Sequence, residues 1–259
     1  MNPALVKLQA DNSLLRLKNN PYPGRGLVVG LNKTSTHILQ LYWIMGRSEN
    51  SRNRIFEFTD GKLFTKPADP TKIQDPSLII YDAMLEIPHF PVEGGRKIKK
   101  FAVSNGKQTE DILKYGITST EFREDWQYEP DAPNFTPRIN GMVYWEKLLK
   151  EKQVRYRVEM SILTKDPFSA ECNHRIYSYG HLEPGIGYCL TTYRGEPVNE
   201  GVPLPPFEGS PSPFLLNGTP AEILNEVWQY LNVENVVSFA VKSIHLFTGE
   251  SEIQCINKY

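Results

Sequence analysis

Two apolar runs near the amino terminus decide the fold class: GLVVGL at positions 26–31 and HILQLYWIM at positions 37–45. β-branched and aromatic side chains dominate both runs, in continuous or alternating order, which is typical of β-strands. Similar runs recur along the chain, so we expect strands to outnumber helices. The further runs lie at residues 55–58, 77–85, 100–105, 155–163, 175–180, 188–193 and 236–247.

The clearest predicted helix is TPAEILNEVWQYL, residues 219–231. Thr219 is suited to cap it, Pro220 fits the first helical position and Glu222 completes a capping box. Its apolar residues recur at helical spacing and form one stripe, which predicts packing against a sheet.

A second helix is expected at residues 109–116, with Thr109 as its cap and Gly116 as its end. Many strands with few helices predict an α+β or layered sheet protein. The Pro- and Gly-rich segment 201–214 predicts a surface loop, because it suits neither a central strand nor a helix. Only about 45 residues follow it, too few for a separate core, so we expect one domain over residues 1–259.

Charge and cysteine content exclude several classes of function. The chain has 29 basic and 30 acidic residues, so it lacks the global field that draws a protein onto nucleic acid or an anionic membrane. No run approaches the roughly 20 apolar residues of a membrane span. Cys172, Cys189 and Cys255 are few and far apart, which argues against a disulfide framework and a paired zinc motif. We therefore expect a cytoplasmic protein.

A polar connection at residues 45–58, MGRSENSRNRIFEF, lies between two predicted strands. Guanidinium groups bind phosphate oxygens bidentately, and serine hydroxyls add neutral donors, so the run suits a phosphate monoester. Composition alone favours a simpler alternative, a solvated hairpin, because loops are routinely polar. The side chains in question are Arg47, Ser48, Ser51, Arg52, Asn53 and Arg54.

Two turns offer further candidate ligand contacts. YPGRGLVVG places Arg25 between glycines, but a dinucleotide loop would need a following helix, whereas a strand is expected here. Asn105 and Gly106 lie at a tight turn before the Thr109 helix, where helix amides and the Asn side chain could face a ligand. A plain strand-to-helix turn explains the second pattern equally well.

The irregular segment YEPDAPNFTPRING, residues 128–141, contains Glu129, Asp131 and Arg138 ahead of a strand. A carboxylate in such a segment can act as a general acid or base. A surface salt bridge is the commoner explanation.

Taken together and in order, five segments resemble the archaeal-type IMP cyclohydrolase family. The resemblance is strong from Tyr22 to about Ile139 and weaker beyond, where LTTYRGEP and the TPAEI helix remain similar. It leaves outside an N-terminal extension, residues 1–21, and the loop 201–214. The five segments are YPGRGLVVG, GRSENSRNR, DPSLIIYDAM, AVSNGKQTED and YEPDAPNFTPRI.

The resemblance implies a four-layer αββα sandwich similar to the N-terminal-nucleophile hydrolase fold, without a freed N-terminal nucleophile. It also implies ring closure of formylated aminoimidazole carboxamide ribotide to IMP with loss of water, in purine biosynthesis. This reaction needs no cofactor or metal, and the implied partner is a purine nucleotide monophosphate. A homo-oligomer is compatible with the sequence, which does not fix the number of subunits.

Tyr81 and Glu129 match family positions near the reacting groups and are the candidate catalytic residues, although Tyr81 alone would be an ordinary strand aromatic. The arginine-rich loop is about two residues longer than is usual in the family, so Ser51 and Arg52 have no assured counterpart. Two alternatives stay open: a purine-nucleotide-binding sensor without turnover, and an amidohydrolase on the same scaffold. The resemblance assigns Arg25, Arg47, Ser48, Asn53 and Arg54 to phosphate and ribose, and Asn105, Gly106, Thr109 and Arg138 to the base.

Overall fold

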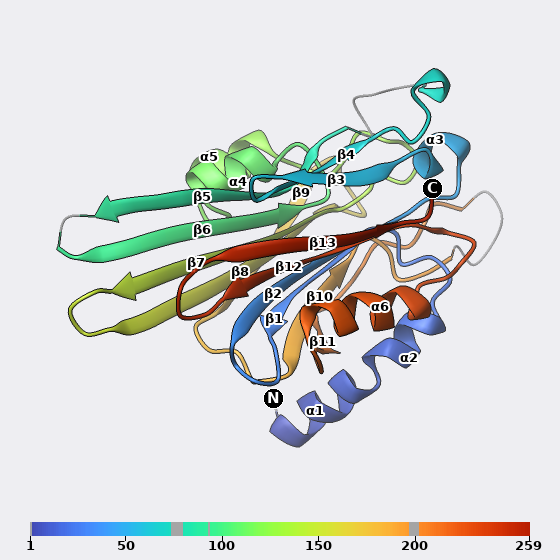
Figure 1. Ribbon diagram of the computed structural model, residues 1–259. Helices are drawn as coiled ribbons and strands as arrows, with labels where there is room; N and C mark the ends of the chain where they lie inside the picture. The colour runs from blue at the N-terminus through green and yellow to red at the C-terminus, as the bar shows by residue number, and fades with distance from the viewer. Residues whose placement is uncertain (1, 74–79, 93, 197–201) are drawn as a thin grey trace.

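The protein is a mixed α/β structure with two antiparallel sheets and few helices (Figure 1). The computed structural model describes residues 2–73, 80–92, 94–196 and 202–259. A six-stranded sheet has the order β11-β10-β1-β2-β12-β13, and a seven-stranded sheet has the order β3-β4-β5-β6-β7-β8-β9. The first sheet comprises β1 (Gly26–Leu31), β2 (His37–Met45), β10 (Ile186–Thr191), β11 (Ser212–Leu215), β12 (Val236–His245) and β13 (Ser251–Asn257). The second comprises β3 (Ile55–Thr59), β4 (Lys62–Lys66), β5 (Asp82–Val92), β6 (Arg96–Ser104), β7 (Arg138–Leu148), β8 (Gln153–Lys165) and β9 (Cys172–Tyr179).

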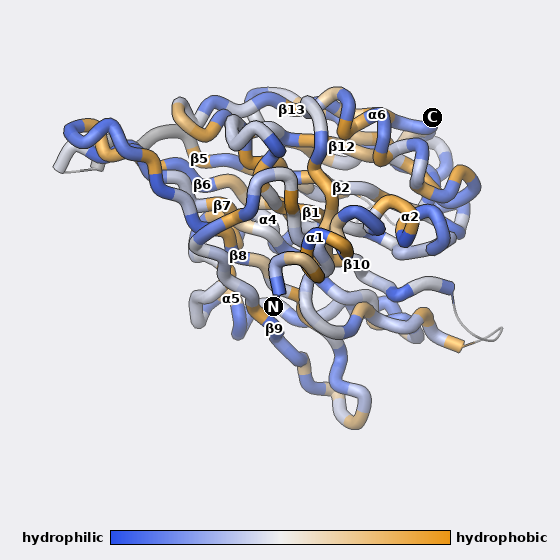
Figure 2. Tube along the Cα trace, turned by 90° about the horizontal axis from the view of Figure 1, so that it is seen from below, coloured by the Kyte–Doolittle hydropathy of each residue, from blue (hydrophilic) through white to orange (hydrophobic). Residues whose placement is uncertain are grey.

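Strands β1 and β2 are largely apolar because both of their faces are covered. Leu27 and Val29 face the core between the two sheets, whereas Val28 faces the helical side. In β2, Tyr42 faces the inter-sheet core and Trp43 the helical side. Figure 2 shows the hydrophobic segments along these inner strands and hydrophilic residues at the loop ends.

The helices cover the outer faces of both sheets (Figure 1). Helices α1, α2 and α6 lie on the six-stranded sheet, and α4 and α5 lie on the seven-stranded sheet, where Ile112 and Phe122 pack against Met142. The helices are α1 (Pro3–Asp11), α2 (Ser13–Lys18), α3 (Glu49–Arg52), α4 (Thr109–Tyr115), α5 (Thr120–Asp125) and α6 (Pro220–Tyr230), with a short 3-10 helix η1 (Pro70–Lys72).

The prediction for α6 is confirmed in detail, whereas the cap predicted for α4 is wrong. Thr219 and Glu222 form the expected capping box, with Pro220 at the start of α6. Gln108, not Thr109, occupies the cap position of α4 and makes no capping hydrogen bond. The Thr109 hydroxyl instead bonds Ser104 and main-chain carbonyls, so it serves the neighbouring turn.

Three segments differ from the sequence-based expectation. The connection 45–58 joins strands of different sheets, so the hairpin alternative is wrong and the segment is a crossover containing α3. Ser212–Phe214, expected in the loop 201–214, belong to the edge strand β11, where Pro213 is tolerated because one side needs no ladder bond. Residue 201 of that loop, and residues 77–79 of a predicted strand, lie outside the described residues.

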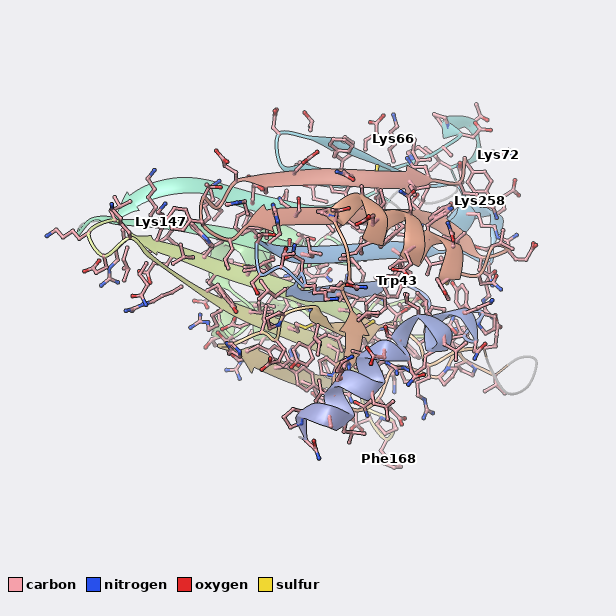
Figure 3. All side chains as sticks on the ribbon, turned by 60° about the horizontal axis from the view of Figure 1, so that its bottom comes forward. Trp43, Lys66, Lys72, Lys147, Phe168 and Lys258 are labelled. Carbon is pink, nitrogen blue, oxygen red and sulfur yellow. The ribbon has the colours of Figure 1, made fainter. Side chains whose placement is uncertain are left out.

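The extension 1–21 contains helices α1 and α2, which we did not predict. Asn2 caps α1 and Pro3 opens it, a recognisable start signal. Leu14 and Leu17 of α2 pack into the cluster that contains Trp43, which lies within the layered interior in Figure 3. None of the described helices is long and apolar enough to cross a membrane.

A buried ion pair joins the two sheets away from their loop ends. The Nζ atom of Lys242 on β12 lies 2.5 Å from a carboxylate oxygen of Glu86 on β5, and the lysine side chain is 0% exposed. Lys242 also donates to the carbonyl of Gly61 at 2.7 Å, and Ser251 donates to Glu86. Burial lowers the pKa of Lys242, and Glu86 opposes this shift. The charge of this lysine is therefore matched inside the protein.

Candidate active site

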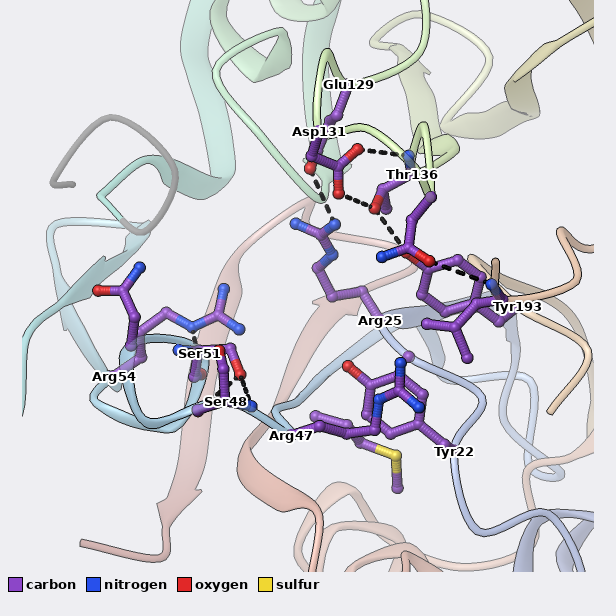
Figure 4. A pocket seen from close by; sticks show the side chains of 15 residues that line it. Tyr22, Arg25, Arg47, Ser48, Ser51, Arg54, Glu129, Asp131, Thr136 and Tyr193 are labelled. Carbon is purple, nitrogen blue, oxygen red and sulfur yellow. Dashed lines mark hydrogen bonds and ion pairs between the residues drawn. The ribbon is translucent and has the colours of Figure 1, made fainter. Parts of the chain in front are cut away.

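A pocket of about 300 Å³ lies at one end of the two sheets (Figure 4). It forms where β1 begins, β2 ends and the chain leaves β10, and the loop before β7 closes it. Figure 4 shows Arg54 and Ser51 on one side and Arg25, Glu129 and Thr136 on the other. Five predicted site residues line it: Arg25, Arg47, Ser48, Arg54 and Glu129.

Arg25 is held at the pocket by close packing of the segment around it. A side chain at Gly24, which has φ +72°, would place Cβ 2.1 Å from the Thr192 hydroxyl. At Gly26, Cβ would meet the Trp43 ring at 2.0 Å. The Arg25 N–H donates to the Thr192 hydroxyl at 3.1 Å, and the Thr192 N–H donates to the Arg25 carbonyl at 2.8 Å, so the segment YPGRG lies beside residues 190–196. The two glycines permit that approach.

Glu129 lies between two arginines inside the pocket wall. Its carboxylate is 3.0 Å from Nη2 of Arg25 and 3.8 Å from Nη1 of Arg138, and all three side chains are nearly buried. Burial favours loss of the Arg25 charge, but Glu129 and then nearby tyrosines raise the pKa of Arg25 well above its ordinary value. Arg25 therefore stays charged and holds the carboxylate in position.

Arg54 is a buried cation with no carboxylate within ion-pairing distance among the described residues. It is 4% exposed, and its Nε donates to the carbonyl of Ser51 at 2.8 Å. Burial lowers the pKa of Arg54, and the charge of Arg25 lowers it further, although Tyr81 opposes them. A buried charge is costly unless it is paired. The arrangement suits an anion that enters the pocket.

Arg47 and Ser48 also line the pocket, but both are more exposed to solvent than Arg54. Arg47 is 39% exposed, pairs with Glu196 at 3.2 Å and stacks over the Tyr22 ring at 4.7 Å. Ser48 caps α3 in a reciprocal box with Ser51. Ser51, which has no assured family counterpart, also lines the pocket.

Other predicted contacts do not line the pocket. Asn53 holds the main chain of Asp69 through both of its amide atoms, so it anchors the end of the crossover. Asn105 is fully buried, accepts from Ile139 N and donates to the Pro137 carbonyl. These amide groups are satisfied within the protein and serve as scaffold.

Gly106, Thr109 and Arg138 form the layer behind Glu129. A side chain at Gly106 would lie 2.6 Å from Arg138 Nη1. Arg138 donates to Gln108 at 2.9 Å and stacks over Trp126. Burial lowers the pKa of Arg138, whereas Glu129 opposes that effect. Only Arg138 of these three contacts a pocket-lining residue by charge.

Tyr81 is not among the residues that line the pocket, but two residues that do, Arg25 and Arg54, are close enough for their charges to act on it. Its hydroxyl is 2.7 Å from that of Tyr42, which is completely buried, and Tyr81 itself is 6% exposed. The charges of Arg25 and Arg54 act on this pair. Sequence reasoning identified Tyr81 but not Tyr42, which is indistinguishable from a core aromatic in its strand.

A second group of hydrogen-bonded side chains runs from Tyr193 through Thr136 to Asp131. Of these three residues, the sequence pointed only to Asp131. Thr136 donates its hydroxyl proton to Asp131 and its main-chain N–H to the same carboxylate at 2.6 Å. Tyr193 bonds the Thr136 hydroxyl and stacks on Tyr22, and burial raises the Tyr193 pKa. The signals were present, because both tyrosines stand in segments that carry the resemblance.

Comparison with known families shows to which family the chain belongs. A family model described as IMP cyclohydrolase-like protein matches residues 22–249. The chain belongs to this family. Every pocket-lining residue falls within the matched range, and α1 and α2 precede it. A search of curated proteins found no match. Within the described residues, no three His, Cys, Asp or Glu side chains are grouped so that they could hold a metal ion.

Proposed function

We propose that this member of the IMP cyclohydrolase-like family closes the ring of formylated aminoimidazole carboxamide ribotide to give IMP and water. The observation that supports this best is Arg54, a buried arginine with no carboxylate partner among the residues that the structure describes, in the same pocket as the ion-paired carboxylate of Glu129. A nucleotide monophosphate supplies the missing anion at one end. The reacting groups then lie towards Glu129.

The chemistry needs three functions from the protein. The carboxamide nitrogen attacks the formyl carbon, so a base takes an N–H proton, a donor stabilises the developing oxyanion and an acid assists loss of hydroxide. We assign the base to Glu129 and the acid to Tyr81. Arg25 and Arg138 keep Glu129 oriented, and Arg25 adds positive charge near the oxyanion. Positioning supplies much of the acceleration, because both reacting groups already sit on one imidazole ring.

We further propose that the two sheets with their outer helices form one domain, a four-layer αββα sandwich similar to that of N-terminal-nucleophile hydrolases. The layers observed on both sheet faces support this. Arg25, not a freed nucleophile, immediately precedes β1. The site therefore uses side chains from several loops.

A spectroscopic assay of IMP formation from the formylated ribotide tests the proposed activity. We expect turnover with the purified protein and none with the nucleoside lacking phosphate. The double ion pairing of Glu129 also suits a sensor that binds the nucleotide without converting it. Tight IMP binding with no turnover would favour that sensor and contradict the enzyme. Release of ammonia or formate would instead indicate an amidohydrolase.

A further inference from the structure

The buried pair of Tyr42 and Tyr81 has a hydrogen-bond direction that follows from counting donors and acceptors. Tyr42 is 0% exposed, and among the described residues its hydroxyl bonds only the hydroxyl of Tyr81, at 2.7 Å. A buried O–H without an acceptor is costly. The proton of Tyr42 must therefore point to the oxygen of Tyr81.

This direction leaves the proton of Tyr81 free for a different acceptor. Tyr81 makes no other side-chain hydroxyl bond among the described residues, and it is the member of the pair with exposed surface, 6%. A tyrosine hydroxyl has one proton to give. That proton is therefore available to water or to a molecule bound beside Arg25 and Arg54, which line the pocket and whose charges act on Tyr81.

Two positively charged side chains act on the pair of hydroxyls. Arg25, ahead of β1, and Arg54, after α3, face the two hydroxyls from different segments, and Tyr42 faces Tyr81 from β2. Burial raises the pKa of Tyr42 well above its ordinary value, and the hydrogen bond with Tyr81 adds to this rise. Tyr42 therefore keeps its proton, as a hydrogen-bond donor must.

We propose that Tyr42 is a positioning residue: it donates a hydrogen bond to Tyr81, aims the Tyr81 proton into the pocket and stabilises the resulting phenolate. The catalytic part of this inference rests on the proposed ring closure. There, Tyr81 protonates the oxygen that leaves as water while the C–O bond breaks. The phenolate regains a proton from the formamido nitrogen, directly or through Glu129, as the C=N bond forms. Protons and electrons balance without a further reactant.

The titration of Tyr81 tests the inference without requiring turnover. NMR of protein labelled at tyrosine Cζ follows Tyr81, and its signal is identified by its loss in Tyr81→Phe. We expect Tyr42→Phe to raise the Tyr81 pKa by about one to two pH units, because a hydrogen bond to a charged group is lost. Tyr179→Phe, which removes a phenol stacked on Tyr188 elsewhere in the core, should leave that titration unchanged. An unchanged Tyr81 pKa in Tyr42→Phe would overturn the proposal.

Kinetics and thermal unfolding provide two further readouts. Tyr42→Phe should lower kcat about tenfold with KM within twofold, and should move the alkaline limb of the kcat profile to higher pH, since Tyr81 stays protonated longer. Tyr81→Phe strands the buried Tyr42 proton, so the double variant Tyr42→Phe/Tyr81→Phe should melt at a higher temperature than Tyr81→Phe. Strictly additive losses of stability would contradict the donor direction. A shifted Tyr81 titration in a protein without turnover would support the pair while refuting the enzyme.

Discussion

Two buried cations of this protein, Lys242 and Arg54, differ in how their charge is compensated. Lys242, between the sheets, has the carboxylate of Glu86 at 2.5 Å and a main-chain carbonyl. Arg54, in the pocket, has a main-chain carbonyl and no carboxylate within ion-pairing distance among the described residues. Both lose hydration by burial, which lowers both pKa values. The inter-sheet pair is complete within the chain, whereas we propose that a ligand supplies the counter-ion in the pocket.

This difference separates the consequences of mutation. Removing one partner of a complete buried pair leaves an uncompensated charge, so stability should fall. Removing a cation that lacks a partner relieves a cost, so stability should hold while ligand binding is weakened. Variants of the two regions should therefore differ in which property they change.

The largest expected effect is on turnover in the pocket. Tyr81→Phe and Glu129→Gln should each lower kcat by about 10²- to 10⁴-fold, the usual worth of a placed proton-transfer group, with IMP affinity nearly kept. Steady-state kinetics and calorimetry with IMP measure the two quantities. Turnover of Tyr81→Phe within twofold of the parent would remove Tyr81 from the mechanism.

The next effect concerns the inter-sheet core. Glu86→Gln should lower the free energy of unfolding by about 3 kcal/mol, because it leaves Lys242 charged and buried. Urea denaturation measures this, and IMP affinity should not change. Glu57→Gln is the matched control, because Glu57 and Lys66 form an exposed ion pair on the surface. Such pairs contribute little to the free energy of unfolding. Equal losses of unfolding free energy in Glu86→Gln and Glu57→Gln would show that the Lys242 pair is no more important for stability than an exposed pair.

A smaller free-energy change is expected at Arg54. Arg54→Met should weaken IMP binding about 10- to 100-fold, the value of charge-assisted hydrogen bonds, without lowering the free energy of unfolding. Calorimetry and urea denaturation on the same preparations separate the two properties. A large loss of stability would show that Arg54 is structural, like Lys242.

The smallest effect is expected at Arg47, which is partly exposed and already paired with Glu196. Arg47→Ala should raise KM by about fivefold or less, with a still smaller change in kcat, since exposed ion pairs contribute little. Glu196→Gln frees Arg47 from its partner and should lower KM slightly. A change in KM for Arg47→Ala as large as that for Arg54→Met would place the main anion contact at Arg47 instead.

Sequence patterns located much of the fold and part of the site. Capping signals predicted α6, and apolar runs predicted most strands of both sheets but not β4, β11 or β13, because these signals depend on local residue order. The motif around Arg25 and the segment containing Glu129 were matched by resemblance, and the structure brings them within 3.0 Å. Which polar side chains serve as scaffold could not be read locally: Asn53 is engaged by Asp69, 16 residues away. The role of Tyr42 depends on the opposite sheet, so strand pattern alone could not reveal it.

The central claim is that a nucleotide phosphate is the missing counter-ion of Arg54. Calorimetry of IMP and inosine against the parent protein and Arg54→Met tests it most directly. We expect the parent to bind IMP at least about tenfold more tightly than inosine, and Arg54→Met to lose most of this preference while it keeps its affinity for inosine. Equal affinity of the parent for IMP and inosine, or an undiminished preference in Arg54→Met, would contradict it.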